Sequence, residues 1–233
     1  MNYFLGLDVG NSTVKAVVLD ENKNISFKRC IQHFGQPVIV SKNLIEEISK
    51  EFSDVKMFLS GANSSLIAPP EYIKSEVPAL QNGVCFLYPQ AKSLIEIGAQ
   101  NARYITNIGD HQPPLFAINE NCAGGTGSFF EDQMNRLGLI TEDYSDIVKN
   151  AVSVPRLSGR CSVFAKTDII HRQQEGVPTA DILLGLCYAT IKNLKSTIIK
   201  NLQIENPIVL GGGVVHNSVV VKAVKEFFEL SEQ

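Results

Sequence analysis

The chain is poor in the features that mark nucleic-acid-binding, membrane and secreted proteins. Its 21 Lys and Arg are outnumbered by 24 Asp and Glu, and the net charge of −3 argues against non-specific binding to nucleic acid. We find no apolar run that approaches the roughly 20 residues needed to span a bilayer. The start, Met1–Asp8, leads straight into a strand and has no basic signal region. These absences predict a cytoplasmic protein that binds neither nucleic acid nor a membrane.

Cysteines and histidines are few and irregularly spaced. Five cysteines, an odd number, do not form the disulfide framework of a secreted protein. Cys85 and Cys187 lie in apolar runs, and we expect both to be small core residues. Cys122 and Cys161 differ, because each lies in a polar segment next to glycine. The four histidines lack the spacing of metal ligands, so none is predicted to bind a metal.

Apolar patterns predict a mixed α/β chain. The N-terminal part predicts three strands, a helix and a fourth strand, at Leu5–Val9, Lys15–Leu19, Ile25–Phe34, Val38–Phe52 and Val55–Leu59. The C-terminal part predicts a strand, three helices, a strand and a closing helix, at Arg103–Thr106, Ser128–Leu137, Val163–Arg172, Ala180–Ile199, Pro207–Leu210 and Ser218–Phe228. This order favours mixed sheets with helical cover.

One strand–turn–strand unit occurs twice. Gly6–Thr13 and Leu94–Asn101 both place an acid, an aliphatic residue, a glycine and polar residues in the same order, and a strand follows each copy. Such a duplication predicts two similar lobes that face a cleft. We place an N-terminal lobe at residues 1–88 and a C-terminal lobe at residues 89–233.

The first copy has the residues of a phosphate-binding loop. Its carboxylate, Asp8, can hold a magnesium ion through water. The backbone at Gly10 can approach a phosphate closely, and the side chains that follow can donate hydrogen bonds to it. These candidate donors are Asn11, Ser12, Thr13 and Lys15. A solvated strand lysine explains Lys15 equally well, and such a turn taken alone is often only a β-hairpin.

Two further glycine-containing segments favour a nucleotide site over a simple hairpin. In the second copy, Glu96 is a second candidate catalytic carboxylate, and Gly98, Ala99 and Gln100 form its turn. Near the C-terminus, Gly211, Gly212 and Gly213 end a strand and precede a helix, which brings backbone close to a nucleotide. Asn217 follows and is a candidate contact to a base or ribose.

Cys122 directly precedes a glycine turn, with Gly124 and Gly125, that opens onto a helix. Backbone N–H groups and the helix dipole favour a thiolate there, and they suit a phosphate or a negatively charged metal–sulfur cluster as well. Cys161 lies in a similar setting. Two thiolates alone cannot complete a four-coordinate metal site. Either a second subunit supplies two more ligands, or the two thiols are free.

Taken in order, five motifs resemble a known family. They are Leu7-Asp8-Val9-Gly10-Asn11-Ser12-Thr13, Ile95-Glu96-Ile97-Gly98-Ala99-Gln100, Asn121-Cys122-Ala123-Gly124-Gly125-Thr126-Gly127, Cys161-Ser162-Val163-Phe164-Ala165 and Gly211-Gly212-Gly213-Val214-Val215-His216-Asn217. The chain is similar over nearly its whole length to ATP-dependent activators of 2-hydroxyacyl-CoA dehydratases and to ATPase subunits of benzoyl-CoA reductases. The two cysteine motifs are the specific part of this resemblance.

The resemblance implies an actin-like, sugar-kinase-like fold of the ribonuclease H type, with two lobes around ATP or ADP and Mg²⁺. It also implies a homodimer that shares one 4Fe-4S cluster, with Cys122 and Cys161 as the ligands from each subunit. In that family, ATP binding and hydrolysis accompany transfer of a low-potential electron to a dehydratase or reductase that acts on a CoA substrate. An external donor such as ferredoxin or flavodoxin supplies the electron.

The second loop departs from the family pattern Asp-Ile-Gly-Gly-Gln-Asp. Glu96 is one methylene longer, Ala99 adds a methyl group and Asn101 lacks the charge. This variant resembles the first activator-like module of longer fused proteins. Family members continue past the closing helix, so we expect the C-terminal elements to be truncated. Two alternatives remain: a nucleotide-binding regulatory module with little hydrolysis, and a small-molecule kinase of the same superfamily.

Overall fold

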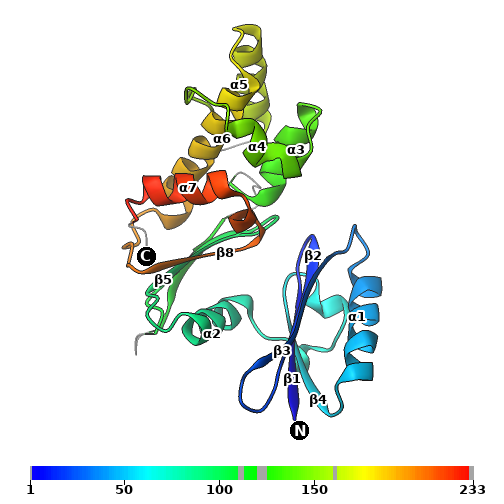
Figure 1. Cartoon of the computed structure of the whole chain (residues 1–233). Helices are drawn as coiled ribbons and strands as arrows, with labels where there is room; N and C mark the ends of the chain where they lie inside the picture. The colour runs from blue at the N-terminus through cyan, green and yellow to red at the C-terminus, as the bar shows by residue number, and fades with distance from the viewer. Residues whose placement is uncertain (1, 110–112, 120–124, 160–161, 231–233) are drawn as a thin grey trace. The chain divides into compact units, whose positions relative to one another are not determined.

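The computed structural model describes residues 2–109, 113–119, 125–159 and 162–230 (Figure 1). The chain divides into two compact units, Met1–Gly83 and Val84–Gln233. Each unit contains one four-stranded sheet. The fold is given below for each unit by itself.

The first unit has the predicted strand–strand–strand–helix–strand order. Its elements are β1 (Tyr3–Val9), β2 (Thr13–Leu19), β3 (Ile25–Gln32), α1 (Pro37–Glu51) and β4 (Val55–Ser60). Two short 3₁₀ turns, Ser64–Leu66 and Pro70–Tyr72, lead to α2 (Glu76–Leu87). The sheet order is β3-β2-β1-β4, with antiparallel pairing except between β1 and β4, which are parallel. The sequence-based prediction of these strands and of α1 is confirmed.

The second unit repeats this topology. Its strands are β5 (Ser93–Ile97), β6 (Ala102–Thr106), β7 (Leu115–Ile118) and β8 (Ile208–Gly211), in the order β7-β6-β5-β8. Again the first three strands pair antiparallel, and β5 pairs in parallel with β8. The helices are α3 (Gly127–Arg136), α4 (Tyr144–Val148), α5 (Ser162–Gln174), α6 (Thr179–Asn193) and α7 (Ser218–Phe227). The duplicated hairpin of the sequence is therefore the start of a duplicated sheet.

Helix α1 and the first sheet form the core of the first unit. Pro37 occupies the first helical turn, where its missing N–H costs no hydrogen bond. Leu44 and Ile48 lie one turn apart on the buried face and pack against Leu7 and Val14 of the strands. The alternation of buried and exposed residues along β2 leaves its other face toward solvent.

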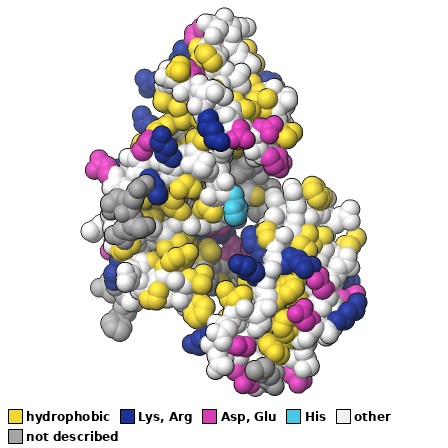
Figure 2. All heavy atoms as spheres, viewed as in Figure 1, with side chains coloured by type: hydrophobic (Ala, Val, Ile, Leu, Met, Phe, Trp, Pro, Cys, Tyr) yellow, Lys and Arg dark blue, Asp and Glu magenta, His cyan; other side chains and the backbone are white. Residues whose placement is uncertain are grey.

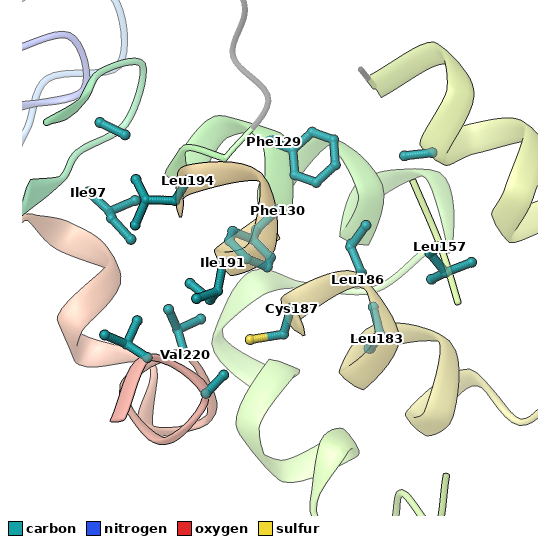
Figure 3. Close-up of a cluster of buried hydrophobic side chains, with 14 of the residues drawn as sticks. Ile97, Phe129, Phe130, Leu157, Leu183, Leu186, Cys187, Ile191, Leu194 and Val220 are labelled. Carbon is teal, nitrogen blue, oxygen red and sulfur yellow. The ribbon is translucent and has the colours of Figure 1, made fainter. Parts of the chain in front are cut away.

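The core of the second unit is built around α6 (Figure 3). Leu183, Leu186, Cys187 and Ile191 of this helix are buried among side chains from β5, α3 and α7. The predicted helix Ala180–Ile199 is found in two parts, because its last six residues, Leu194–Ile199, form a π-helical turn. A single π turn inside a helix shifts the following side chains around the axis.

One prediction about apolar runs is wrong. Thr179–Ile199 is long and apolar enough to cross a membrane by length and composition alone. However, 61% of its most apolar 18-residue window is buried inside the second unit. Packing on several sides, as Figure 3 shows for α6, requires a helix that is apolar nearly all round. Its composition is thus explained by the core.

The cysteines with described environments differ in burial. Cys187 is buried as predicted, and burial, with the Glu226 carboxylate in addition, raises the pKa of its thiol to about 12. Cys85 is only half-buried, so its assignment to the core was wrong. It lies on α2, a helix that sequence patterns did not predict and whose neighbouring Phe86 and Leu87 are exposed. Cys30 is exposed on the outer strand β3.

Candidate functional site

The first loop connects β1 to β2 and is closed by its own backbone. The Gly10 N–H donates to the Thr13 carbonyl at 3.0 Å, which turns the chain tightly between the strands. Asn11 lines a surface hollow of about 610 Å³ that belongs to the first unit alone. The loop is therefore a β-hairpin turn, which was the simpler of the two interpretations of the sequence. It is also accessible to solvent.

Asp8 and Lys15 form an ion pair beside this loop. They lie directly opposite each other in the β1–β2 register, and Lys15 Nζ donates to Asp8 Oδ2 at 2.8 Å. Both side chains are about half exposed, at 45% for Lys15 and 44% for Asp8. An ion pair this open to water contributes little stability and can exchange partners easily. Lys15 is thus held next to the loop without being fixed there.

Two side chains that were not among the predicted site residues hold the backbone of the first loop in place. His33 Nε2 and Asn63 Nδ2 both donate to the Gly10 carbonyl, at 3.2 and 2.8 Å. His33 Nδ1 accepts from the Gly35 N–H at 3.2 Å, which leaves Nε2 as the ring nitrogen that donates to the Gly10 carbonyl. His33 is 5% exposed. Through these two hydrogen bonds, His33 fixes the backbone of the first loop.

Gly61 brings the end of β4 against the same loop. Its φ is +96°, and a Cβ there would lie 2.4 Å from Asp8 Oδ1 and 2.6 Å from the Val9 carbonyl oxygen. Only glycine combines this backbone conformation with so close an approach. Asn63 follows, and its N–H donates to the Val9 carbonyl at 2.9 Å. The first loop therefore depends on a turn about fifty residues later in the chain, which no local pattern reveals.

The second loop has the same design in the second unit. Gly98 N–H donates to the Asn101 carbonyl at 2.8 Å, as Gly10 does to Thr13. Glu96 and Arg103 lie opposite each other in the β5–β6 register, and Arg103 Nη1 donates to Glu96 Oε2 at 2.7 Å. This pair is largely shielded from water: the Glu96 side chain is 14% exposed and the Arg103 side chain 8%. Arg103 was not among the predicted site residues.

The N-terminus of α3 packs directly onto the second loop. Gly127 N–H donates to the Gly98 carbonyl, and Ser128 N–H donates to the Ala99 carbonyl, each at 2.8 Å. These two first-turn donors are engaged with protein backbone. Asn119 supports the other side: its Oδ1 accepts from the Ala102 N–H at 2.8 Å, and its Nδ2 donates to the Gln100 carbonyl at 3.0 Å.

The glycine run at the end of β8 meets the second loop as well. Gly211 lies opposite Glu96 in the β5–β8 register. Gly212 has φ +88°, and a Cβ there would lie 2.2 Å from the Ile97 carbonyl oxygen. At Gly213 a Cβ would meet nothing within 4 Å. Gly212 is therefore required by its close approach to the β5 backbone, and Gly213 leaves open space at the surface of the loop.

Asn217 has a clear structural role. Its Oδ1 accepts from the N–H groups of Val219 and Val220, at 3.1 and 3.3 Å, which makes it the N-cap of α7. The Ser145 hydroxyl also donates to this oxygen at 3.2 Å. Its suggested contact to a base or ribose stays a prediction.

Three predicted residues, Cys122, Gly124 and Cys161, lie outside the described residues. Their described flanks converge on one helix. A Cβ at Gly125 would lie 3.7 Å from Asn193 Nδ2, and a Cβ at Gly159 would lie 2.2 Å from the Ala189 carbonyl oxygen. Ala189 and Asn193 are neighbours on adjacent turns of α6. Gly125 and Gly159 therefore both lie against adjacent turns of α6.

Two aspartates accept hydrogen bonds from the segment that precedes the second cysteine motif in the sequence. Asp181 is buried and accepts hydrogen bonds from the Ser153 hydroxyl at 2.6 Å and from the Val152 N–H at 2.7 Å. These bonds, that from Ser153 most strongly, hold the pKa of the Asp181 carboxyl below its usual value. Asp168 Oδ2 accepts from the Ser158 N–H at 2.7 Å. Helices α5 and α6 therefore both fix this segment.

Over the described part of the chain, no group of three His, Cys, Asp or Glu side chains is placed to hold a metal ion. On the face shown in Figure 2, acidic and basic side chains are interspersed on both units. A mixed surface of this kind does not form the basic stripe that a nucleic-acid interface requires.

Comparisons with known proteins agree with this geometry. A family model described as the BadF/BadG/BcrA/BcrD ATPase family matches residues 5–232. The 2-hydroxyisocaproyl-CoA dehydratase activator of Clostridioides difficile is 26% identical over 226 residues, which cover 95% of this chain and 85% of that protein. The (R)-2-hydroxyglutaryl-CoA dehydratase activating ATPase of Acidaminococcus fermentans is 25% identical over 229 residues, 96% of this chain and 87% of that protein.

A solved structure supports the fold. The activator of 2-hydroxyisocaproyl-CoA dehydratase from Clostridium difficile with bound ADPNP matches with a TM-score of 0.84 and 26% identity. The match covers 97% of this chain and 86% of that one. The predicted actin-like α/β fold is confirmed.

Proposed function

The chain belongs to the BadF/BadG/BcrA/BcrD ATPase family, and from this premise we propose that it binds and hydrolyses ATP to activate a partner enzyme acting on a CoA substrate. The duplicated hairpin carries the proposal. In both units a carboxylate lies at the end of a strand, an ionic partner lies opposite it, and a glycine turn follows. A carboxylate that can hold a metal ion and a glycine turn that lets backbone approach are groups that a bound phosphate chain requires.

Each loop has a distinct proposed role. Asp8 holds Mg²⁺ through water, and the backbone at Gly10 and Gly98 approaches the phosphates, with Asn11, Ser12, Thr13, Lys15, Ala99 and Gln100 as further contacts. When bound, the metal ion neutralises charge that develops on the phosphates. Glu96 orients the water that attacks the terminal phosphate. The glycine run at residues 211–213 contacts adenosine. The open space at Gly213 supports this last assignment.

We further propose that Cys122 and Cys161 hold one 4Fe-4S cluster together with the same two residues of a second copy. Support comes from Gly125 and Gly159, which lie near the two cysteines in the sequence and both approach adjacent turns of α6. Two thiolates from each of two chains complete the four ligands that such a cluster takes. The cluster supplies a low-potential electron. The glycine turn at residues 124–125 provides backbone N–H groups toward it or toward an anion.

The names of two relatives support the proposed partner. Both are activators of CoA-substrate dehydratases by name. The proposed homodimer takes an electron from a donor such as ferredoxin or flavodoxin in the cytoplasm and delivers it to a dehydratase or reductase of this type. The acyl-CoA substrate belongs to that partner.

ATP binding and phosphate release test the nucleotide part of the proposal. The purified protein should bind Mg·ATP by calorimetry and release phosphate. Glu96→Gln should keep binding and lose turnover, whereas Glu142→Gln, which changes an exposed carboxylate, should match the wild type. Binding without turnover in the wild type would support the regulatory-module alternative. Turnover that requires an added small alcohol would support the kinase alternative.

A further inference from the structure

The two loops share a feature beyond their carboxylates and glycines. In each hairpin a basic residue follows the acid by seven positions, Lys15 after Asp8 and Arg103 after Glu96. Each base lies directly across from its acid in the strand register and donates to it, at 2.8 and 2.7 Å. The acid–base pair is therefore part of the duplicated unit.

The two pairs differ in burial, and this difference sets what each can do. Asp8 and Lys15 are about half exposed, so water competes for both groups and the lysine can leave its partner for a phosphate. Glu96 and Arg103 are nearly enclosed, at 14% and 8% exposure. A charge that is shielded from water is strongly destabilised without its partner. We therefore expect Glu96 and Arg103 to stay paired. Arginine suits the buried position, because its planar guanidinium loses less on desolvation than an ammonium.

The residues around Glu96 also set the orientation of its carboxylate. Arg103 holds Glu96 Oε2 from the β6 side. On the β8 side, Gly211 lies opposite Glu96, and a Cβ there would be in ordinary van der Waals contact with Glu96 Cγ, at 3.7 Å. The other oxygen, Oε1, lies under the loop, 3.2 Å from where a Cβ of Gly98 would be. One oxygen is fixed by the arginine, and the other faces the backbone of the second loop.

We propose that Arg103 is the positioning residue of the second loop: by holding Oε2 of Glu96, it keeps Oε1 aimed at the water that attacks ATP. This inference rests on the proposed hydrolysis. In that step the water oxygen bonds to the terminal phosphorus, the bond to the bridging oxygen breaks, and its electron pair leaves on ADP. Of the two protons of the water, one stays on the phosphate that forms and the other is released to solvent. Glu96 Oε1 accepts a hydrogen bond from the water. Arg103 acts through Glu96 and touches no reacting atom.

The test compares Arg103→Met and Arg103→Lys with Arg136→Met, which removes an exposed arginine paired with Asp132. Steady-state hydrolysis gives kcat and KM, and calorimetry gives ATP affinity. Arg103→Met should lower kcat by about 100-fold at unchanged ATP affinity, because a misplaced catalytic group costs roughly this much. Arg103→Lys, which keeps the charge, should recover part of the loss. Arg136→Met should match the wild type.

A wild-type kcat in Arg103→Met, or a loss confined to ATP affinity, would overturn the proposal. If Arg103→Met fails to fold, Arg103→Lys alone decides, since it leaves no unpaired buried charge. A second measurement does not depend on turnover. The carbon-13 carboxyl resonance of Glu96, assigned by its loss in Glu96→Gln, should move in Arg103→Lys and not in Arg136→Met. An unmoved resonance would refute the positioning role, whereas absent turnover in the wild type would refute only the proposed hydrolysis.

Discussion

Replacing Gly212 by alanine tests how the glycine run is joined to the second loop. Gly212 has φ +88° and ψ 172°, a backbone region that is essentially restricted to glycine. The added methyl group would lie 2.2 Å from the Ile97 carbonyl oxygen and 2.5 Å from its carbonyl carbon. Both atoms are backbone of β5, so no side-chain rotation can relieve the overlap.

The expected loss has two contributions. An unfavourable backbone conformation costs about 1–3 kcal/mol. Forcing packed groups apart costs about 1–3 kcal/mol more. Together these destabilise the fold by about 2–6 kcal/mol, and since 1 kcal/mol shifts Tm by about 2–4 °C in a chain of this size, Tm should fall by at least about 4 °C.

Gly213→Ala is the matched control. A methyl group there meets nothing within 4 Å and the φ of this residue is not positive, so the unfolding free energy should change by less than about 0.5 kcal/mol. Urea and thermal unfolding by circular dichroism measure both variants. Gly213→Ala should still weaken ATP binding, as a proposed adenosine contact. A Gly212→Ala variant as stable as the wild type would refute the packing argument.

Three further results are expected. Asn63→Ala should lower the unfolding free energy by about 0.5–1.5 kcal/mol in urea titrations, because it removes one of the two donors to the Gly10 carbonyl. A thiol reagent at pH 8 should label exposed Cys30, and Cys187 only after unfolding; the stability from its raised pKa is lost above pH 9, as pH rises toward about 12. Asp181→Asn should destabilise at neutral pH, and the difference should vanish as acid protonates the wild-type carboxyl, whose folded-state pKa is lowered.

Local sequence patterns were sufficient for most of the fold. Strand alternation, the helical spacing in α1 and the repeated hairpin depend on residues close together in the chain, and these elements were predicted. Short β7, between Leu115 and Ile118, was missed. Three of its four apolar residues are exposed on the outermost strand of the sheet, so no alternation marks it.

The site was predictable only in part, since its supports come from distant residues. Asp8 and Glu96 stood out by their repeated setting. His33, Asn63 and Asn119 are far along the chain from the backbone groups that they hold, so no local sequence pattern connects them. Arg103 is different. Its match to Lys15 in the repeat was visible in the sequence, but burial of the ion pair became evident only once the strands were paired.

The central claim is that two copies of this chain share a cluster held by Cys122 and Cys161. The most direct measurement is iron and acid-labile sulfide content, with the oligomer mass, in one anaerobically purified sample. The account predicts a dimer with about four iron and four sulfide per two chains, lost in both Cys122→Ser and Cys161→Ser. An iron-free protein, or a cluster retained in either variant, would contradict it.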